Sequence, residues 1–125
     1  NAAGGAVNSR GLRVKGGALD LARTVPAYGA NVATNASLGN FFAVAVSNGV
    51  AFTMDAPTFP VTGQQITYTI HNNAGGAMGV VTWAATFRLA GAWVNPADTF
   101  NRSITFHYNG TNWFEVSRTA ADVAN

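Results

Sequence analysis

The fold is decided by the stretch Asn101–Thr119, NRSITFHYNGTNWFEVSRT, in which two runs of alternating character flank one turn. In the first run the apolar residues Ile104, Phe106 and Tyr108 alternate with polar ones. Residues two apart in a strand share a face, so this run predicts a half-buried β-strand. Asn109-Gly110 follows, and both residues tolerate the positive φ that a tight hairpin needs. The stretch therefore predicts a β-hairpin.

The return run sorts its side chains onto two faces of the second strand. Phe114 and Val116 fall on one face, and Trp113, Glu115 and Ser117 fall on the other. Trp113 thus stands just past the turn on the more polar face. An aromatic ring in that position is available to a ligand.

Alternating runs elsewhere predict further short strands. Phe41–Ser47 is apolar on both faces, so we expect it in the middle of a sandwich or beneath a neighbouring subunit. Asn48-Gly49 joins it to Val50–Met54 and indicates a second hairpin. Gln64–Asn72 and Val80–Ala84 have the composition and alternation of two more strands.

The signals for helix are weak throughout the chain. No stretch of about 11 residues sustains a 3.6-residue period. Short strands with frequent turn signals favour an antiparallel sandwich or barrel. We therefore predict one all-β domain at residues 11–125, an antiparallel, jelly-roll-like β-sandwich, preceded by a flexible arm or linker at residues 1–10.

Length and composition narrow the classes of function. A chain of 125 residues with 48% apolar content can bury a core unaided, and the absence of cysteine removes thiolate chemistry. Charged residues make up 10% of the chain, against about 25% in typical soluble domains. Short uncharged polar groups suit a subunit that packs against copies of itself, because little charge is desolvated at the contacts. The scattered basic residues argue against nucleic-acid binding, and no apolar run is long enough for membrane insertion.

The titratable residues offer few catalytic arrangements. His71 and His107 fall on the polar sides of predicted strands, and no third ligand stands at a spacing that completes a metal site. Glu115 could serve as one of the two catalytic carboxylates of a glycoside hydrolase only if a neighbouring strand or another subunit supplied the second one. Its simpler role is an ion pair with Arg118 or Arg102. We expect neither enzymatic activity nor a cofactor.

Aromatic and polar residues in the second half are candidates for contact with a glycan or with another subunit. Aromatic rings stack on sugars, but they also dominate cores and interfaces. The candidates are Trp113, Trp93, Tyr108, His107 and Glu115.

Several motifs of the second half resemble one class of protein. They are Pro60-Val-Thr-Gly63-Gln64-Gln-Ile66, Asn72-Asn-Ala-Gly75-Gly76-Ala, Val81-Thr-Trp83, the closing run Ile104–Glu115 and the ending Arg118-Thr-Ala-Ala-Asp122-Val. Over about residues 57–125 the chain resembles the C-terminal β-modules of bacteriophage tail fibres, tailspikes and related virion-surface proteins.

The resemblance implies a small β-sandwich that assembles as a homotrimer on the surface of the phage particle. There it would cap a fibre or spike, bind a host-surface glycan, or decorate the capsid beside other virion proteins. A carbohydrate-binding module of a host-recognition protein or of a polysaccharide-active enzyme is the alternative. The location on the particle, the host and the glycan stay open.

Overall fold

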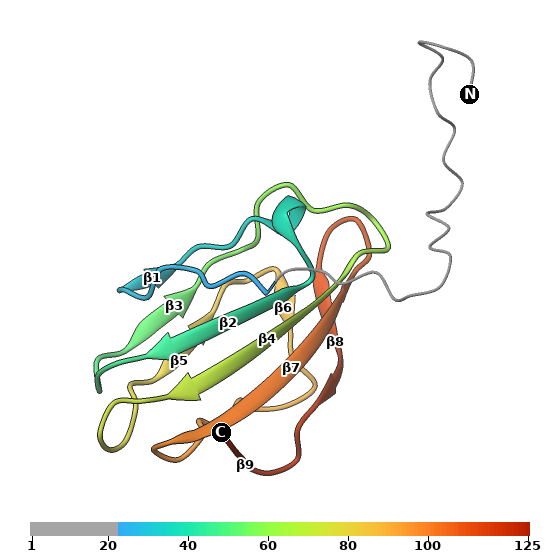
Figure 1. The fold of residues 1–125 in the computed structure, drawn as a ribbon. Coiled ribbons are helices and arrows are strands. Elements are labelled where there is room, and N and C mark those ends of the chain that lie inside the picture. The colour runs from blue at the N-terminus through green and yellow to red at the C-terminus, as the bar shows by residue number, and fades with distance from the viewer. Residues whose placement is uncertain (1–22) are drawn as a thin grey trace, which may run out of the picture.

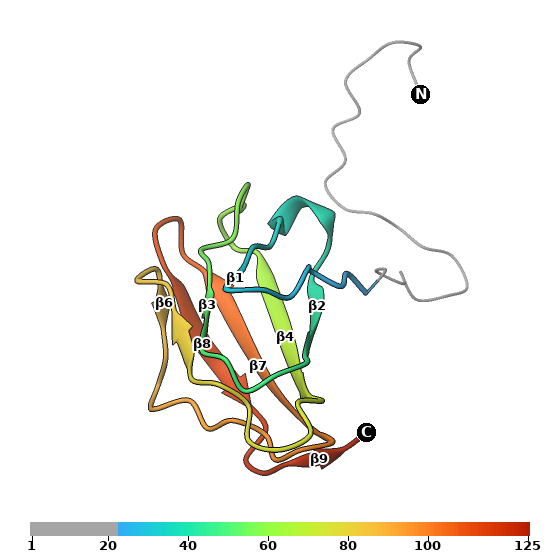
Figure 2. The ribbon, with the colours of Figure 1, turned by 90° about the vertical axis from the view of Figure 1, so that its left-hand side faces the viewer.

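The strands of this protein form two sheets that face each other across a single core (Figure 1, Figure 2). The computed structural model describes residues 23–125, so the predicted arm at residues 1–10 and the first part of the predicted domain lie outside it. Of the described residues 43% are in strands and 3% in a helix, and the prediction of a nearly all-β chain is confirmed.

The smaller sheet has three strands and the larger sheet six. The smaller one is ordered β1-β3-β5, with β1 at Asn31–Val32, β3 at Phe52–Met54 and β5 at Val81–Trp83. The larger one is ordered β2-β4-β7-β8-β6, with β9 paired to the start of β7. Its strands are β2 at Phe41–Val46, β4 at Gln65–Asn72, β6 at Phe87–Arg88, β7 at Phe100–Tyr108, β8 at Trp113–Arg118 and β9 at Val123–Ala124. A short 3-10 helix, η1 at Ala36–Leu38, connects β1 to β2.

The first five strands alternate between the two sheets. β1, β3 and β5 pair in parallel, and β2 pairs in parallel with β4. This path is that of a β-solenoid rather than of a jelly roll, so the predicted antiparallel pairing is corrected for this half of the chain. The cause is one-sided burial, because β2 and β3 each hide alternate residues and meet across the core rather than edge to edge.

The predicted hairpin at Asn48-Gly49 does not form. A two-residue hairpin turn of the favoured type needs positive φ at both central residues, and neither Asn48 nor Gly49 has it. The side-chain oxygen of Asn48 accepts a hydrogen bond from the Val50 N–H, and the chain passes into the other sheet. The same dipeptide thus makes a connection between sheets here.

The closing hairpin forms as predicted. β7 and β8 are antiparallel, and Gly110 takes a φ of 99° in the loop between them. The side-chain oxygen of Asn109 accepts hydrogen bonds from the N–H groups of Thr111 and Asn112, which closes the loop.

The core is filled by alternate residues of the strands, as the sequence pattern indicated. Its largest fully buried side chains include Trp113, Tyr68, Phe42, Phe106 and Met54. Of the outward residues of β2, Ala43 is half-buried, whereas Phe41 and Ala45 are exposed, Phe41 by 50%. Within a single chain, the prediction that Phe41–Ser47 is buried on both faces is therefore confirmed only for the face that points into the core.

Tyr68 of β4 lies at the centre of this core. Its ring is 5.6 Å from Phe42 of the same sheet and 6.0 Å from Trp83 of the opposite sheet, measured between centroids. Its hydroxyl lies 2.7 Å from the hydroxyl of the buried Thr34, just past β1. Burial raises the pKa of Tyr68 well above its ordinary value, so the phenol stays protonated. This one side chain joins both sheets by packing and by a hydrogen bond.

Replacing Tyr68 tests the central hydrogen bond. Tyr68→Phe leaves the Thr34 hydroxyl buried without a partner, and we expect the free energy of unfolding to fall by about 1 to 3 kcal/mol in a urea titration. The double variant Tyr68→Phe/Thr34→Val removes both polar groups and should recover part of that loss. A double variant less stable than Tyr68→Phe would contradict this account.

Candidate functional site

The outward side of strands β2, β4 and β7 of the larger sheet, called the outer face below, is lined by hydroxyl, amide, imidazole and apolar side chains. Its members are Phe41, Ala43 and Ala45 of β2, Gln65, Thr67, Thr69 and His71 of β4, and Asn101, Ser103, Thr105 and His107 of β7. These residues alternate with core residues along each strand, so they share one side of the sheet. No Asp, Glu, Lys or Arg belongs to the set.

Hydroxyl groups pair across the middle of the outer face. The antiparallel register of β4 and β7 sets Thr67 opposite Thr105, and Thr69 opposite Ser103. In each pair the two hydroxyl oxygens are 2.8 Å apart. One hydroxyl donates to the other, so each pair keeps one proton and several lone pairs for a partner outside the sheet. The outer face therefore offers hydrogen bonds without charge.

An imidazole lies at one end of this row. Nδ1 of His71 is 3.0 Å from Oδ1 of Asn101. The Asn101 amide nitrogen donates to the Val123 carbonyl and to Oδ1 of Asn125, so its oxygen faces the ring. In the neutral ring this contact places the proton on Nδ1 and leaves Nε2 as an acceptor.

A hollow of about 250 Å³ opens beside His71. Its rim begins at the outer edge of β2, where Thr24 is paired: the Thr24 N–H donates to the Phe41 carbonyl and the Ala43 N–H donates to the Thr24 carbonyl. The lining includes Arg23, Ala43, Ala45, Thr69, His71 and Asn101. Among the residues that the structure describes, Arg23 supplies the only Asp, Glu, Lys or Arg side chain of the hollow.

Two of the predicted contact residues, Trp113 and Tyr108, lie on the core side instead. Trp113 is 1% exposed and its ring is 4.7 Å from that of Tyr108, so the prediction that Trp113 lies on the polar face is wrong. The reason is the register, because Trp113 lies opposite Tyr108 and opposed residues share a face. Any hairpin loop with an even number of residues places Trp113 on the same face as Phe106 and Tyr108. The loop length was therefore the signal in the sequence that could have placed Trp113 in the core.

His107 and Trp93 lie in two other places. His107 belongs to the outer face, and its ring is 5.1 Å from that of Phe114. Trp93 lies in the loop after β6, half-buried against Trp83, and its Nε1 donates to the side chain of Asn95. The five predicted contact residues therefore do not converge on one site.

Glu115 forms an ion pair with Arg118, one of the two partners expected from the sequence. The guanidinium donates to both carboxylate oxygens at 2.5 Å and also to the carbonyls of Gly91 and Ala92. The carboxylate accepts the Ala90 N–H as well. Hydrogen bonding to Arg118 lowers the pKa of Glu115. The pair clamps the loop after β6 onto β8.

A β-bulge makes this clamp possible. Glu115 lies opposite Phe106 and Ser117 lies opposite Thr105, so Val116 is one extra residue in β8. Residues three apart in a regular strand point to opposite faces. The extra residue brings Glu115 and Arg118 to the same side of the sheet.

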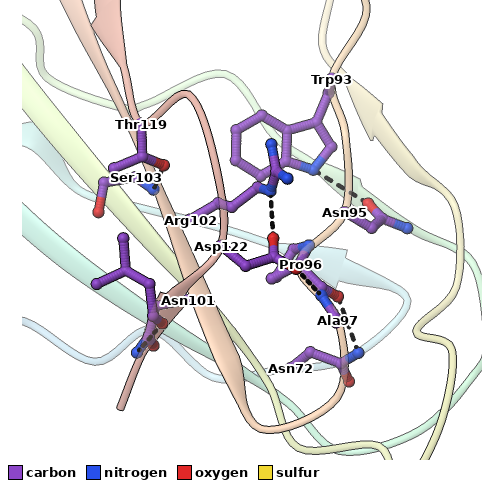
Figure 3. A network of polar contacts seen from close by, with 11 residues as sticks. Asn72, Trp93, Asn95, Pro96, Ala97, Asn101, Arg102, Ser103, Thr119 and Asp122 are labelled. Carbon is purple, nitrogen blue, oxygen red and sulfur yellow. Dashed lines mark hydrogen bonds and ion pairs between the residues drawn. The ribbon is translucent and has the colours of Figure 1, made fainter.

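A second polar network ties the C-terminal tail to the larger sheet (Figure 3). Arg102, the other expected partner of Glu115, instead pairs with Asp122 at 2.6 Å, and this contact lowers the pKa of Asp122. The Asp122 carboxylate also accepts the Ala97 N–H. Nearby, the buried Asn72 amide donates to the carbonyls of Gly76 and Pro96. These groups all have protein partners, so the network holds the tail and the loop before β7 in place.

Two other kinds of site are absent from residues 23–125. Within that range no three His, Asp or Glu side chains gather where they would hold a metal ion. No helix in the same range is long and apolar enough to cross a membrane.

Comparison of the chain with protein-family models, with curated proteins and with solved structures finds no match. The candidate site therefore rests on the geometry of the outer face. Sequence reasoning found its polar residues as alternating positions, but it did not find which of them meet. That pairing depends on the register between β4 and β7, which lie about 35 residues apart along the chain and leave no local signal.

Neutralising the clamp tests its role in stability. Glu115→Gln replaces charge-assisted hydrogen bonds by weaker ones, and we expect the free energy of unfolding at pH 7 to fall by about 1.5 to 3 kcal/mol. The folded-state pKa of Glu115 lies below its ordinary 4.5. Its contribution is therefore complete above about pH 4.5 and is lost as the pH falls through the folded-state value.

Urea titrations of both proteins from about pH 3 to pH 7 measure this effect. The stability difference between wild type and Glu115→Gln should shrink toward acid pH. A difference that stays constant across the range would show that the Glu115 charge contributes nothing.

Proposed function

We propose that this protein is a non-enzymatic structural module of a bacteriophage virion, which assembles as a homotrimer on the particle surface. Its place would be a tail-fibre or spike tip engaged in host attachment, or a capsid decoration beside other virion proteins. The motifs within residues 57–125 that resemble virion-surface β-modules support the class. The uncharged outer face is the observation that supports the assembly.

The outer face has the properties of a contact surface between copies. Three adjacent strands present no ionised Asp, Glu, Lys or Arg there, so covering them desolvates little charge. At its edge Phe41 is 50% exposed and Val25 is 59% exposed, which gives a partner apolar area to bury. Of the eight described charged residues, five follow residue 97, and Arg88 lies on the outward side of β6, two strands away from β7.

The alternative function is a carbohydrate-binding module, and the hollow beside His71 favours it. Thr69 and Nε2 of His71 offer hydrogen bonds there, and the Arg23 guanidinium adds a donor. A glycan bound in this hollow depends on these residues and not on Trp113, which is buried. A glycan-array signal that Thr69→Val abolishes and Trp113→Phe preserves would favour the alternative.

The mass of the purified chain tests the proposed assembly. By light scattering at micromolar concentration we expect about three times the chain mass of 12.9 kDa. Ala45→Arg places a charge on the outer face at β2, next to His71, and we expect it to yield monomers because that charge loses its water at the contact without gaining a partner.

The control is Ala85→Arg, which adds the same charge at an exposed turn away from the outer face. This variant should keep the trimer mass. A wild-type monomer would contradict the proposed assembly. A trimer that Ala45→Arg leaves intact would contradict the outer face as its contact.

A further inference from the structure

One end of the molecule is apolar at its tip and free of charge. The tip, defined as residues 35–40, 56–64 and 109–112, combines η1, the loop after β3 and the hairpin turn, which lie together at one end of the strands (Figure 1). No Asp, Glu, Lys, Arg or His occurs in these segments. Leu38, Phe59 and Val61 are each more than 60% exposed, and Phe59 is the most exposed at 70%.

Phe59 is held in an unfavourable backbone conformation. Its φ is 52°, a region that costs a bulky residue about 1 to 2 kcal/mol. The flanks hold it there, since Thr58 exchanges backbone hydrogen bonds with Thr34 and Ala36. On the other side Gln64 bonds to both the N–H and the carbonyl of Val61. A rigid loop therefore presents an apolar ring to solvent at a cost in conformational energy, which indicates an interaction surface.

The opposite end of the strands contains a hollow of about 130 Å³. This base hollow is lined by Tyr28, Gly29, Ala30, Asn48, Val50 and Ala51, none of which is charged. Its walls are braced, because the Tyr28 hydroxyl donates to Asn48 at 2.9 Å and the Tyr28 ring packs edge-on against Phe52 at 5.3 Å. Val50 adds a side chain that is 64% exposed.

We propose that the tip of one copy docks on the base hollow of a second copy, with Phe59 entering the hollow. The size is comparable, since a cavity of roughly 150 Å³ accepts a benzene ring and the base hollow, at about 130 Å³, is open on one side. Neither surface carries a charge that docking would have to desolvate. Because the two surfaces lie at opposite ends, the contact is head-to-tail and repeats along a line. It is independent of the lateral contact through the outer face.

Two variants that each lose one surface test this arrangement. Phe59→Asn removes the ring and keeps a residue that tolerates positive φ. Val50→Asp places a charge at the mouth of the base hollow. In sedimentation velocity we expect the wild type to grow beyond the trimer mass as its concentration is raised above the micromolar range. Each variant alone should associate end to end about tenfold to a hundredfold more weakly, which corresponds to the loss of one buried aromatic side chain.

A mixture of the two variants gives the decisive result. Phe59→Asn retains an intact hollow and Val50→Asp retains an intact ring, so together they should form a complex of twice the mass of either alone and grow no further. This doubling is expected of monomers, and of trimers whose three tips lie at one end and whose subunits do not exchange during the measurement, so it separates this contact from the lateral one. Val116→Thr, at an exposed valine of β8 far from both ends, should behave as wild type.

Other outcomes would overturn the proposal. Wild-type growth that Phe59→Asn does not weaken, or a mixture that shows no doubling, would exclude the head-to-tail contact. Binding of the wild type to neutral phosphatidylcholine vesicles that Phe59→Asn abolishes, without any growth in mass, would assign the tip to a lipid surface instead.

Discussion

One-sided burial of the larger sheet is the constraint on which the rest of this structure depends. Strands β2, β4 and β7 each place alternate residues in a core centred on Tyr68 and leave the others outside. Tyr68 packs against both sheets and hydrogen-bonds to Thr34, so the two sheets keep a fixed distance. Most of the large apolar side chains of these strands are buried in the core. What remains on the outer face is a row of hydroxyl and amide groups beside the exposed Phe41.

The second half of the chain changes the architecture and holds six of the eight charged residues that the structure describes. After β5 the winding between sheets gives way to the antiparallel strands β7 and β8, which extend the larger sheet. The bulge at Val116 then allows Glu115 and Arg118 to clamp a loop, and Asp122 ties the tail to Arg102. The ion pairs thus stabilise connections at the C-terminal side, and neither involves a residue of the outer face.

The sequence predicted the features that depend on neighbouring residues. Alternation identified Ile66, Tyr68 and Ile70 as one face of a strand, and Asn109-Gly110 as a hairpin, because both signals are local. It could not predict that β2 pairs with β4, since parallel partners distant in sequence leave no pattern at the turn. Asn48-Gly49 shows the limit of a motif, because the dipeptide permits a hairpin but does not require one.

The candidate site was less predictable than the fold. Alternation alone puts Trp113 on the wrong face, because both faces of its strand carry apolar residues. Only the register of the hairpin decides which face is buried. The clamp of Glu115 depends on a bulge, which adds a residue without any sequence signal. The hydroxyl pairs of the outer face require a register between distant strands, so the surface that we regard as functional becomes visible only in three dimensions.

Hydroxyl-radical footprinting of the assembled protein tests most directly whether the outer face is a contact between copies. Phe41 is half-exposed in a single chain, whereas its neighbour Phe42 is 1% exposed and serves as an internal reference. This account predicts that Phe41 is protected from oxidation nearly as well as Phe42 at assembly concentration and becomes reactive on dilution to monomers. Equal reactivity of Phe41 at both concentrations would contradict it.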